Sequence, residues 1–157
     1  MENSLNYLKG DATEPQGQGK KIIVHICNDI GAWGAGFVLA LSRKWSEPQS
    51  EYKNWFRSGK DFELGEVQFV KVEEDIFVAN MIAQRGLVPD EYGPPVRYEA
   101  IVTGLHRVAK KAMELDASLH MPRIGSGLAG GDWNMIEKII KRTLADKGLH
   151  VTVYDLK

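Results

Sequence analysis

Residues 120–133 read HMPRIGSGLAGGDW and satisfy the pattern G-x-G-x-x-G between Gly125 and Gly130. That pattern is the fingerprint of a dinucleotide-binding Rossmann turn, which opens a βαβ unit and precedes an acidic residue about 20 positions further on. The stretch after Gly130 has room for one helix and one strand, and Asp155 is only loosely placed for the acidic role. The position of the loop therefore argues against a Rossmann site and leaves a different phosphate loop or a plain glycine turn.

Hydrophobic periodicity around this loop predicts alternating strands and helices. The run KIIVHICN is rich in β-branched residues and is typical of a strand buried on both faces. Two adjacent runs of strand character, residues 65–72 and 75–84, predict a hairpin. The other strands are expected at 5–9, 117–122 and 150–156, and helices at 37–45, 49–57, 97–115 and 133–147. This order predicts an α/β fold with a mixed, mostly parallel six-stranded sheet between two layers of helices.

Composition narrows the class of protein. The 157 residues are 43% hydrophobic and 26% charged with a formal net charge of -1, which fits one soluble domain spanning 1–157. Near-neutral charge argues against a nucleic-acid partner, and no stretch approaches the roughly 20 apolar residues of a membrane span. The single cysteine, Cys27, is expected to be a buried thiol in a reducing cytoplasm. No helix shows a second apolar stripe, so we expect a monomer.

Two strand-to-helix junctions are rich in glycine: GAWGAG at 31–36 and the loop at 125–131. Glycine lets a ligand approach the backbone closely, and a helix N-terminus offers free N–H groups to an anion. Two such junctions on neighbouring strands predict a site for a diphosphate, with plain structural turns as the alternative. Nothing matches G-x-x-x-x-G-K-[ST], which argues against a Walker-type hydrolase.

Four stretches in order, YLKGDAT, HICNDIGAWGAGFVLAL, MPRIGSGLAGGDW and VTVYDL, together resemble a macro domain over essentially the whole chain. The similar branch is the one that contains ADP-ribose-1″-phosphate phosphatases. The resemblance implies a mixed six-stranded sheet between helices and a cleft for ADP-ribose or its derivatives, including ADP-ribosylated protein.

The resemblance also assigns roles within such a cleft. Asp11, beside Ala12, matches the aspartate that accepts a hydrogen bond from the adenine amino group, with a turn or helix-cap aspartate as the alternative. Tyr154, followed by Asp155, matches the place of an aromatic ring that stacks on adenine, although it could equally be a tyrosine that packs on the sheet. Arg123 is interpreted as a residue that pins the phosphate loop, with a direct contact to phosphate as the alternative. The residues expected to hold the diphosphate are Gly125, Ser126, Gly127, Leu128 and Ala129, opposite Gly34, Ala35 and Gly36.

Hydrolysis at the distal ribose needs a group that activates water, and Asp29, His25 and Asn28 are the candidates. The alternative for His25 is a buried, hydrogen-bonded histidine. One related hydrolase branch uses a lysine after the central strand and an aspartate in the phosphate loop; Ala83 and Ala129 are expected at those places, and Gln84 can offer only polar contacts. The function is therefore left between a metal-free hydrolase, which removes phosphate or an ADP-ribosyl group, and a non-catalytic reader of ADP-ribose. A binder of another nucleotide is a third hypothesis. No pair of histidines has metal-ligand spacing, so neither a metal nor a cofactor is expected.

Overall fold

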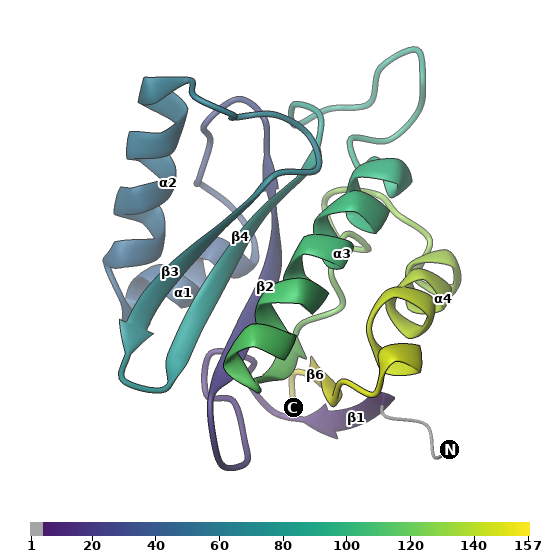
Figure 1. Ribbon diagram of the computed structural model, residues 1–157. Coiled ribbons are helices and arrows are strands. Elements are labelled where there is room, and N and C mark those ends of the chain that lie inside the picture. Colours follow the sequence, from purple (N-terminus) through teal and green to yellow (C-terminus); the bar gives the residue numbers. More distant parts are fainter. Residues whose placement is uncertain (1–4) are drawn as a thin grey trace.

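A six-stranded mixed sheet forms the centre of the computed structural model, which describes residues 5–157 (Figure 1). The strand order is β1-β6-β5-β2-β4-β3, and only the outer pair, β3 and β4, runs antiparallel. The predicted fold class and the predicted hairpin are confirmed. The strands are β1 (Leu5–Lys9), β2 (Lys21–Asn28), β3 (Val67–Glu73), β4 (Ile76–Gln84), β5 (Ser118–Met121) and β6 (Val151–Asp155).

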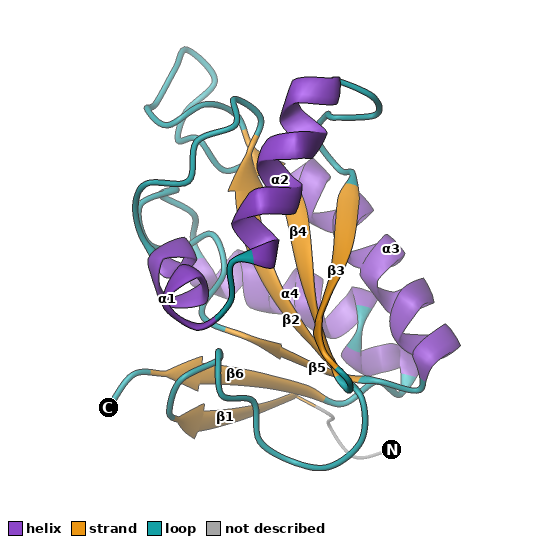
Figure 2. Ribbon diagram, turned by 90° about the vertical axis from the view of Figure 1, so that its left-hand side faces the viewer, coloured by secondary structure: helices purple, strands orange, loops and turns teal. Residues whose placement is uncertain are grey.

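Helices cover both faces of the sheet, as Figure 2 shows. On one face lie α1 (Phe37–Lys44) and α2 (Glu47–Ser58), and on the other lie α3 (Tyr98–Leu115) and α4 (Trp133–Thr143). The alternation of β2 explains the two layers, because its residues contribute to two separate apolar clusters. Ile22 and Val24 pack with α3 and α4, whereas Ile23 and Cys27 pack with α1 and α2. Within the described part of the chain, no helix is long and apolar enough to span a membrane.

Three local details of the helices differ from the predictions. Helix α2 begins at Glu47 and includes Pro48, because proline is compatible with a first helical turn. Helix α4 ends at Thr143, and a separate 3-10 turn (Ala145–Lys147) follows, with Gly148 in the left-handed conformation after it. Buried Leu144 lies between them, where the chain turns inward.

The parallel strands place most of the predicted site residues at one edge of the sheet, whereas His25 lies within β2. Because β1, β6, β5, β2 and β4 run in the same direction, their carboxyl ends lie side by side. The segments that follow these strands carry Asp11, Asn28 with the first glycine loop, Gln84, the second glycine loop and the residues after Tyr154. This is the edge at which open α/β sheets bind their ligands.

Candidate functional site

Three cavities lie along the carboxyl edge of the sheet. The first, about 600 Å³, is lined by Asp11 and Tyr154 and is called here the Asp11 cavity. The middle cavity, about 280 Å³, lies between the two glycine-rich loops. The distal cavity, about 370 Å³, is bounded by Asn28, Trp33 and Leu87. The middle and distal cavities are continuous, because both are lined by Ile26, Ala35, Val38, Gln84 and Leu128.

The second glycine loop presents its backbone to the middle cavity. Gly125, Gly127, Leu128 and Ala129 all line it. Among the residues that the structure describes, the N–H groups of Gly127, Leu128 and Ala129 have no hydrogen-bond acceptor. Ser126 is not placed to contact a phosphate in this cavity. Its hydroxyl donates to the Arg123 carbonyl at 2.9 Å, and the residue does not line the cavity. Free N–H groups at a strand end are suited to phosphate oxygens.

The rear of this loop has no room for side chains. The Gly131 N–H donates to the Gly125 carbonyl at 2.7 Å, and a Cβ added at Gly131 would lie 2.6 Å from that same oxygen. Gly125 has φ 74 and is enclosed by the side chains of Ile26, Val96 and Ile136. The Val96 N–H also donates to the Ala129 carbonyl at 3.1 Å. Glycine is therefore required here by packing and by backbone conformation.

Arg123 anchors the start of the same loop. Its Nε and Nη2 donate to the two carboxylate oxygens of Asp155 at 2.7 and 3.0 Å. The guanidinium also lies over the rings of Tyr7 and Trp133, at 5.1 and 5.3 Å from their centroids. The ion pair with Asp155 raises the pKa of Arg123 and lowers that of the carboxyl. Arg123 is a structural partner of the loop, and it also lines the middle cavity.

The Asn28 amide makes several hydrogen bonds to the first glycine loop, and Lys53 Nζ donates to the Gly31 carbonyl at 2.5 Å. Asn28 Nδ2 donates to the Ala32 carbonyl at 2.8 Å, and its Oδ1 accepts from the N–H groups of Ile30 and Ala32, both at 3.0 Å. The Tyr52 hydroxyl donates to Asn28, with its oxygen 2.6 Å from the backbone carbonyl and 2.9 Å from Oδ1. Burial raises the pKa of Tyr52, so the hydroxyl remains a donor. Asn28 thus shapes the loop, while Gly34, Ala35 and Gly36 line the cavities beyond it.

Asp29 connects the first glycine loop to the segment after β4. Its Oδ1 accepts from the Gly86 N–H at 2.8 Å, and its own N–H donates to the Gln84 carbonyl at 3.0 Å. The side chain is half-buried and lines none of the three cavities. Its second oxygen, Oδ2, has no hydrogen-bond partner in residues 5–157.

His25 lies in the core beneath the middle cavity, with 1% of its surface exposed. Its Nε2 is 2.5 Å from Asn80 Oδ1, while Asn80 Nδ2 donates to Pro48 and Gln68. The Asn80 oxygen is therefore the acceptor, and the proton of His25 resides on Nε2. Burial lowers the pKa of His25 to about 4, so the ring is neutral at pH 7. His25 is therefore a buried ring that is hydrogen-bonded through Nε2, while its Nδ1 has no hydrogen-bond partner among the described residues.

Asp11 and Tyr154 meet at the Asp11 cavity. Asp11 Oδ1 accepts from the N–H and the hydroxyl of Thr13, both at 2.8 Å, whereas Oδ2 has no partner among the described residues. Ala12 is buried and can contribute only its backbone. Tyr154 is 4% exposed, and its hydroxyl accepts from the Gln16 N–H at 2.8 Å and lies 2.8 Å from His120 Nδ1. Tyr154 thus packs as a wall of the cavity and presents little ring face to a ligand.

Gln84, the last residue of β4, lines the cleft, whereas its neighbour Ala83 does not. Ala83, expected at the place of a catalytic lysine, is fully buried in the cluster under α3 and α4. Gln84 is the residue that lines the middle and distal cavities, because side chains alternate along the strand. Its Nε2 donates to the Gly86 carbonyl at 2.9 Å. Sequence alternation alone contains this signal. Trp33 and Leu87, which also line the distal cavity, lie in loops where no periodicity identifies them.

Proteins of known structure share both the sequence and the fold of this chain. No family model matches the chain. A solved macrodomain protein from Streptomyces coelicolor is 53% identical, with a TM-score of 0.85 over 96% of this chain and 98% of that one. A solved protein of unknown function from Bacteroides thetaiotaomicron is 56% identical, with a TM-score of 0.95 over 97% of this chain and 98% of that one. The chain belongs to the macrodomain family.

More distant relatives differ in the share of their length that this chain covers. The chain is 32% identical to a chromodomain-helicase-DNA-binding protein 1-like of Danio rerio over 96% of its own length, but it spans only 15% of that relative. It is 24% identical to an ADP-ribose 1″-phosphate phosphatase of Candida glabrata, over 98% of this chain and 99% of that one. A DarTG structure from Thermosipho africanus in complex with ADP-ribose shares the fold at 17% identity and TM-score 0.69, over 87% of this chain and 38% of that one.

Proposed function

We propose that this macrodomain binds ADP-ribose along the three cavities and through it recognises ADP-ribosyl groups on other molecules. The observation that carries the proposal is the middle cavity, where free N–H groups of the second glycine loop face Gly36 and the start of α1. Two opposed backbone surfaces of this kind suit a diphosphate. The adenosine then lies toward Asp11 Oδ2 and the second ribose toward Asn28 and Gln84.

The distal cavity favours an uncharged linkage at the second ribose. Its polar side chains are the amides Asn28 and Gln84 and the thiol Cys27, and no lysine, arginine or histidine lines it. Burial raises the pKa of Cys27, so the thiol stays neutral. A terminal phosphate carries about -1.5 to -2 charge at pH 7 and would find no cation there. An ester or glycosidic link to a macromolecule meets no such penalty.

Hydrolysis of that link is the second candidate function, and similarity to the fungal phosphatases favours it. Neither His25, which is buried, nor Gln84, which is an amide, can serve as a general base. Asp29 follows Asn28, which lines the distal cavity, and its Oδ2 has no hydrogen-bond partner in residues 5–157, so it can orient a water molecule. In this candidate mechanism Asp29 takes the proton of the attacking water while the loops hold the phosphates.

Calorimetric titration with ADP-ribose, ADP and NAD tests the binding proposal. We expect ADP-ribose to bind and ADP to bind more weakly, because it lacks the second ribose. Incubation with ADP-ribose-1″-phosphate and with an ADP-ribosylated protein then separates the reader from the hydrolase. Hydrolysis is established if the unaltered protein releases ADP-ribose and the Asp29→Asn variant binds the substrate but releases none. Binding without product from either substrate establishes a reader, and absence of any heat with ADP-ribose rejects both.

A further inference from the structure

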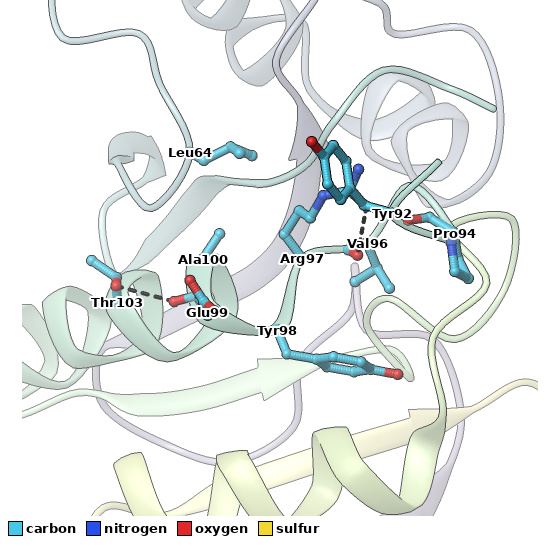
Figure 3. Close-up of a pocket in the computed structure, with 9 residues that line it drawn as sticks. All are labelled: Leu64, Tyr92, Pro94, Val96, Arg97, Tyr98, Glu99, Ala100 and Thr103. Atoms are coloured by element: carbon cyan, nitrogen blue, oxygen red, sulfur yellow. Dashed lines mark hydrogen bonds between the residues drawn. The ribbon is translucent and has the colours of Figure 1, made fainter. Parts of the chain in front are cut away.

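A fourth cavity, of about 580 Å³, lies at the start of α3 and outside the proposed ADP-ribose cleft (Figure 3). Its walls combine apolar and aromatic side chains, including Leu64, Val96, Tyr98 and Tyr92. The Glu99 side chain lines it and has no ion-pair or hydrogen-bond partner in residues 5–157. The guanidinium of Arg97 is already used, since it pairs with Asp90 at 2.8 Å and donates to backbone carbonyls of the loop. Glu99, exposed in the first turn of α3, is therefore the carboxylate of this cavity that has no side-chain partner among residues 5–157.

The segment 85–97 joins this cavity to the distal end of the cleft. Leu87 lines the distal cavity, whereas Tyr92, Pro94 and Val96 line the fourth cavity. Tyr92 lies five positions after Leu87, so the two residues cannot be more than about 18 Å apart. A molecule attached to the second ribose leaves the cleft beside this segment. An extended stretch of about six residues of such a molecule spans the distance to Tyr92.

The surface between the two cavities is apolar. Val88 is 71% exposed, Tyr92 77% and Leu87 53%, and Leu128 of the second glycine loop is 76% exposed beside Leu87 in the distal cavity. Exposed apolar residues gathered around a cleft mouth are typical of an interaction site.

Charge around this apolar surface is predominantly negative. Asp29, Asp90, Glu91 and Glu99 are acidic, and Arg85 and Arg97 are basic. Arg97 is neutralised by Asp90. Such a surface repels a phosphodiester backbone and attracts a segment that carries basic and apolar side chains.

We propose that the surface from Leu87 to the fourth cavity binds the polypeptide that carries the ADP-ribosyl group, with a lysine or arginine of that polypeptide in the fourth cavity. This inference rests on the proposed function. The aliphatic stem of the basic residue packs on Tyr98 and Val96, and its cation faces Glu99. Apolar residues of the segment cover Val88 and Tyr92. The partner is therefore a basic, apolar stretch of protein, and an ADP-ribosylated nucleic acid is disfavoured.

The test compares four probes: free ADP-ribose, an ADP-ribosylated peptide with leucine and lysine within six residues of the modification, the same peptide with glutamate in place of lysine, and an ADP-ribosylated DNA oligonucleotide. Affinity is measured by anisotropy, or kcat/KM where the link is cleaved. We expect the lysine peptide to surpass free ADP-ribose by about ten-fold, and neither the glutamate peptide nor the oligonucleotide to surpass it.

Variants with matched controls locate the effect. Glu99→Lys and Val88→Ser should remove the advantage of the lysine peptide and leave free ADP-ribose binding unchanged, which also reports that the variants fold. Glu114→Lys at the other end of α3, and Met113→Ser, exposed to 51%, should retain the advantage. Two results would overturn the docking surface alone while free ADP-ribose still binds. The lysine peptide could bind no more tightly than free ADP-ribose, or the oligonucleotide could bind more tightly than the lysine peptide. If the unaltered protein does not bind free ADP-ribose, both the proposed function and the docking surface are overturned.

Discussion

The two glycine-rich loops face each other across the middle cavity, yet they are held by different forces. The loop at 125–131 is held by the backbone bond from Gly131 to Gly125 and by the absence of side chains at its rear. The loop at 28–36 is held by the side chain of Asn28, which makes three hydrogen bonds to its backbone. The two loops have a similar glycine content but depend on different interactions. An added methyl group should disrupt the loop at 125–131, and removal of the Asn28 amide should disrupt the first loop.

Gly131→Ala should have the largest effect on stability. The new Cβ would lie 2.6 Å from the Gly125 oxygen, and neither backbone can move without losing the bond between them. We expect the free energy of unfolding to fall by about 3 kcal/mol in urea denaturation. The control is Gly127→Ala in the same loop, where the added Cβ meets nothing within 4 Å and φ is not positive. Equal stabilities for the two variants would contradict the packing account of this loop.

Asn28→Ala should destabilise the protein by about 2 kcal/mol, because it leaves part-buried N–H and C=O groups of the first loop unpaired. Urea denaturation measures the effect, and hydrogen exchange should show the lost protection at Ile30 and Ala32. Asn54→Ala on exposed α2, where the amide bonds only to Arg57, is the control and should change stability by less than about 0.5 kcal/mol. A loop that stays protected without Asn28 would mean that Tyr52 and the backbone suffice.

Acid should weaken the core beneath both loops. The pKa values of His25 and His120 are each lowered from 6.5 to about 4 by burial. The folded protein then binds fewer protons than the unfolded chain between these values, so stability is complete above pH 6.5 and declines as the pH falls toward 4. Each histidine contributes a slope of about 1.4 kcal/mol per pH unit in that window. His25→Gln, which keeps a donor for Asn80, should reduce the slope by about half, and an unchanged slope would refute its burial as a neutral ring.

Asp11→Ala should have the smallest of these effects on ligand binding, and it also removes the two hydrogen bonds from Thr13. Loss of Oδ2 removes one acceptor for the adenine amino group, so we expect affinity for ADP-ribose to fall about ten-fold and affinity for ribose 5-phosphate to remain. Calorimetry with both ligands measures the difference. Asp11 also accepts two bonds from Thr13, so Asp11→Asn, which keeps one acceptor, is the companion variant. Equal losses for both ligands would assign Asp11 to loop structure alone.

The sequence predicts the framework better than it predicts the use of each side chain. The β-branched run of β2, the hairpin and the two glycine junctions suffice to place the loops at one edge, because strand direction determines where the loops lie. Residue roles depend on partners far away in the chain. His25 is neutral because it is buried, and its Nε2 lies against Asn80, 55 positions on. Arg123 reaches Asp155, 32 positions on, beneath Tyr7 and Trp133. No local pattern contains those pairings. In contrast, the alternation of side chains along β4 predicts that Gln84 lines the cavities when Ala83 is buried.

The central claim is that the middle cavity holds the diphosphate of ADP-ribose. Calorimetric titration of the unaltered protein and of Gly127→Glu tests it most directly, because Gly127 lines this cavity and its Cβ position is open. The account predicts saturable binding to the unaltered protein with a dissociation constant below roughly 1 mM, and no binding to the variant at an unchanged unfolding transition. An absence of heat from the unaltered protein, or equal affinity in the folded variant, would contradict it.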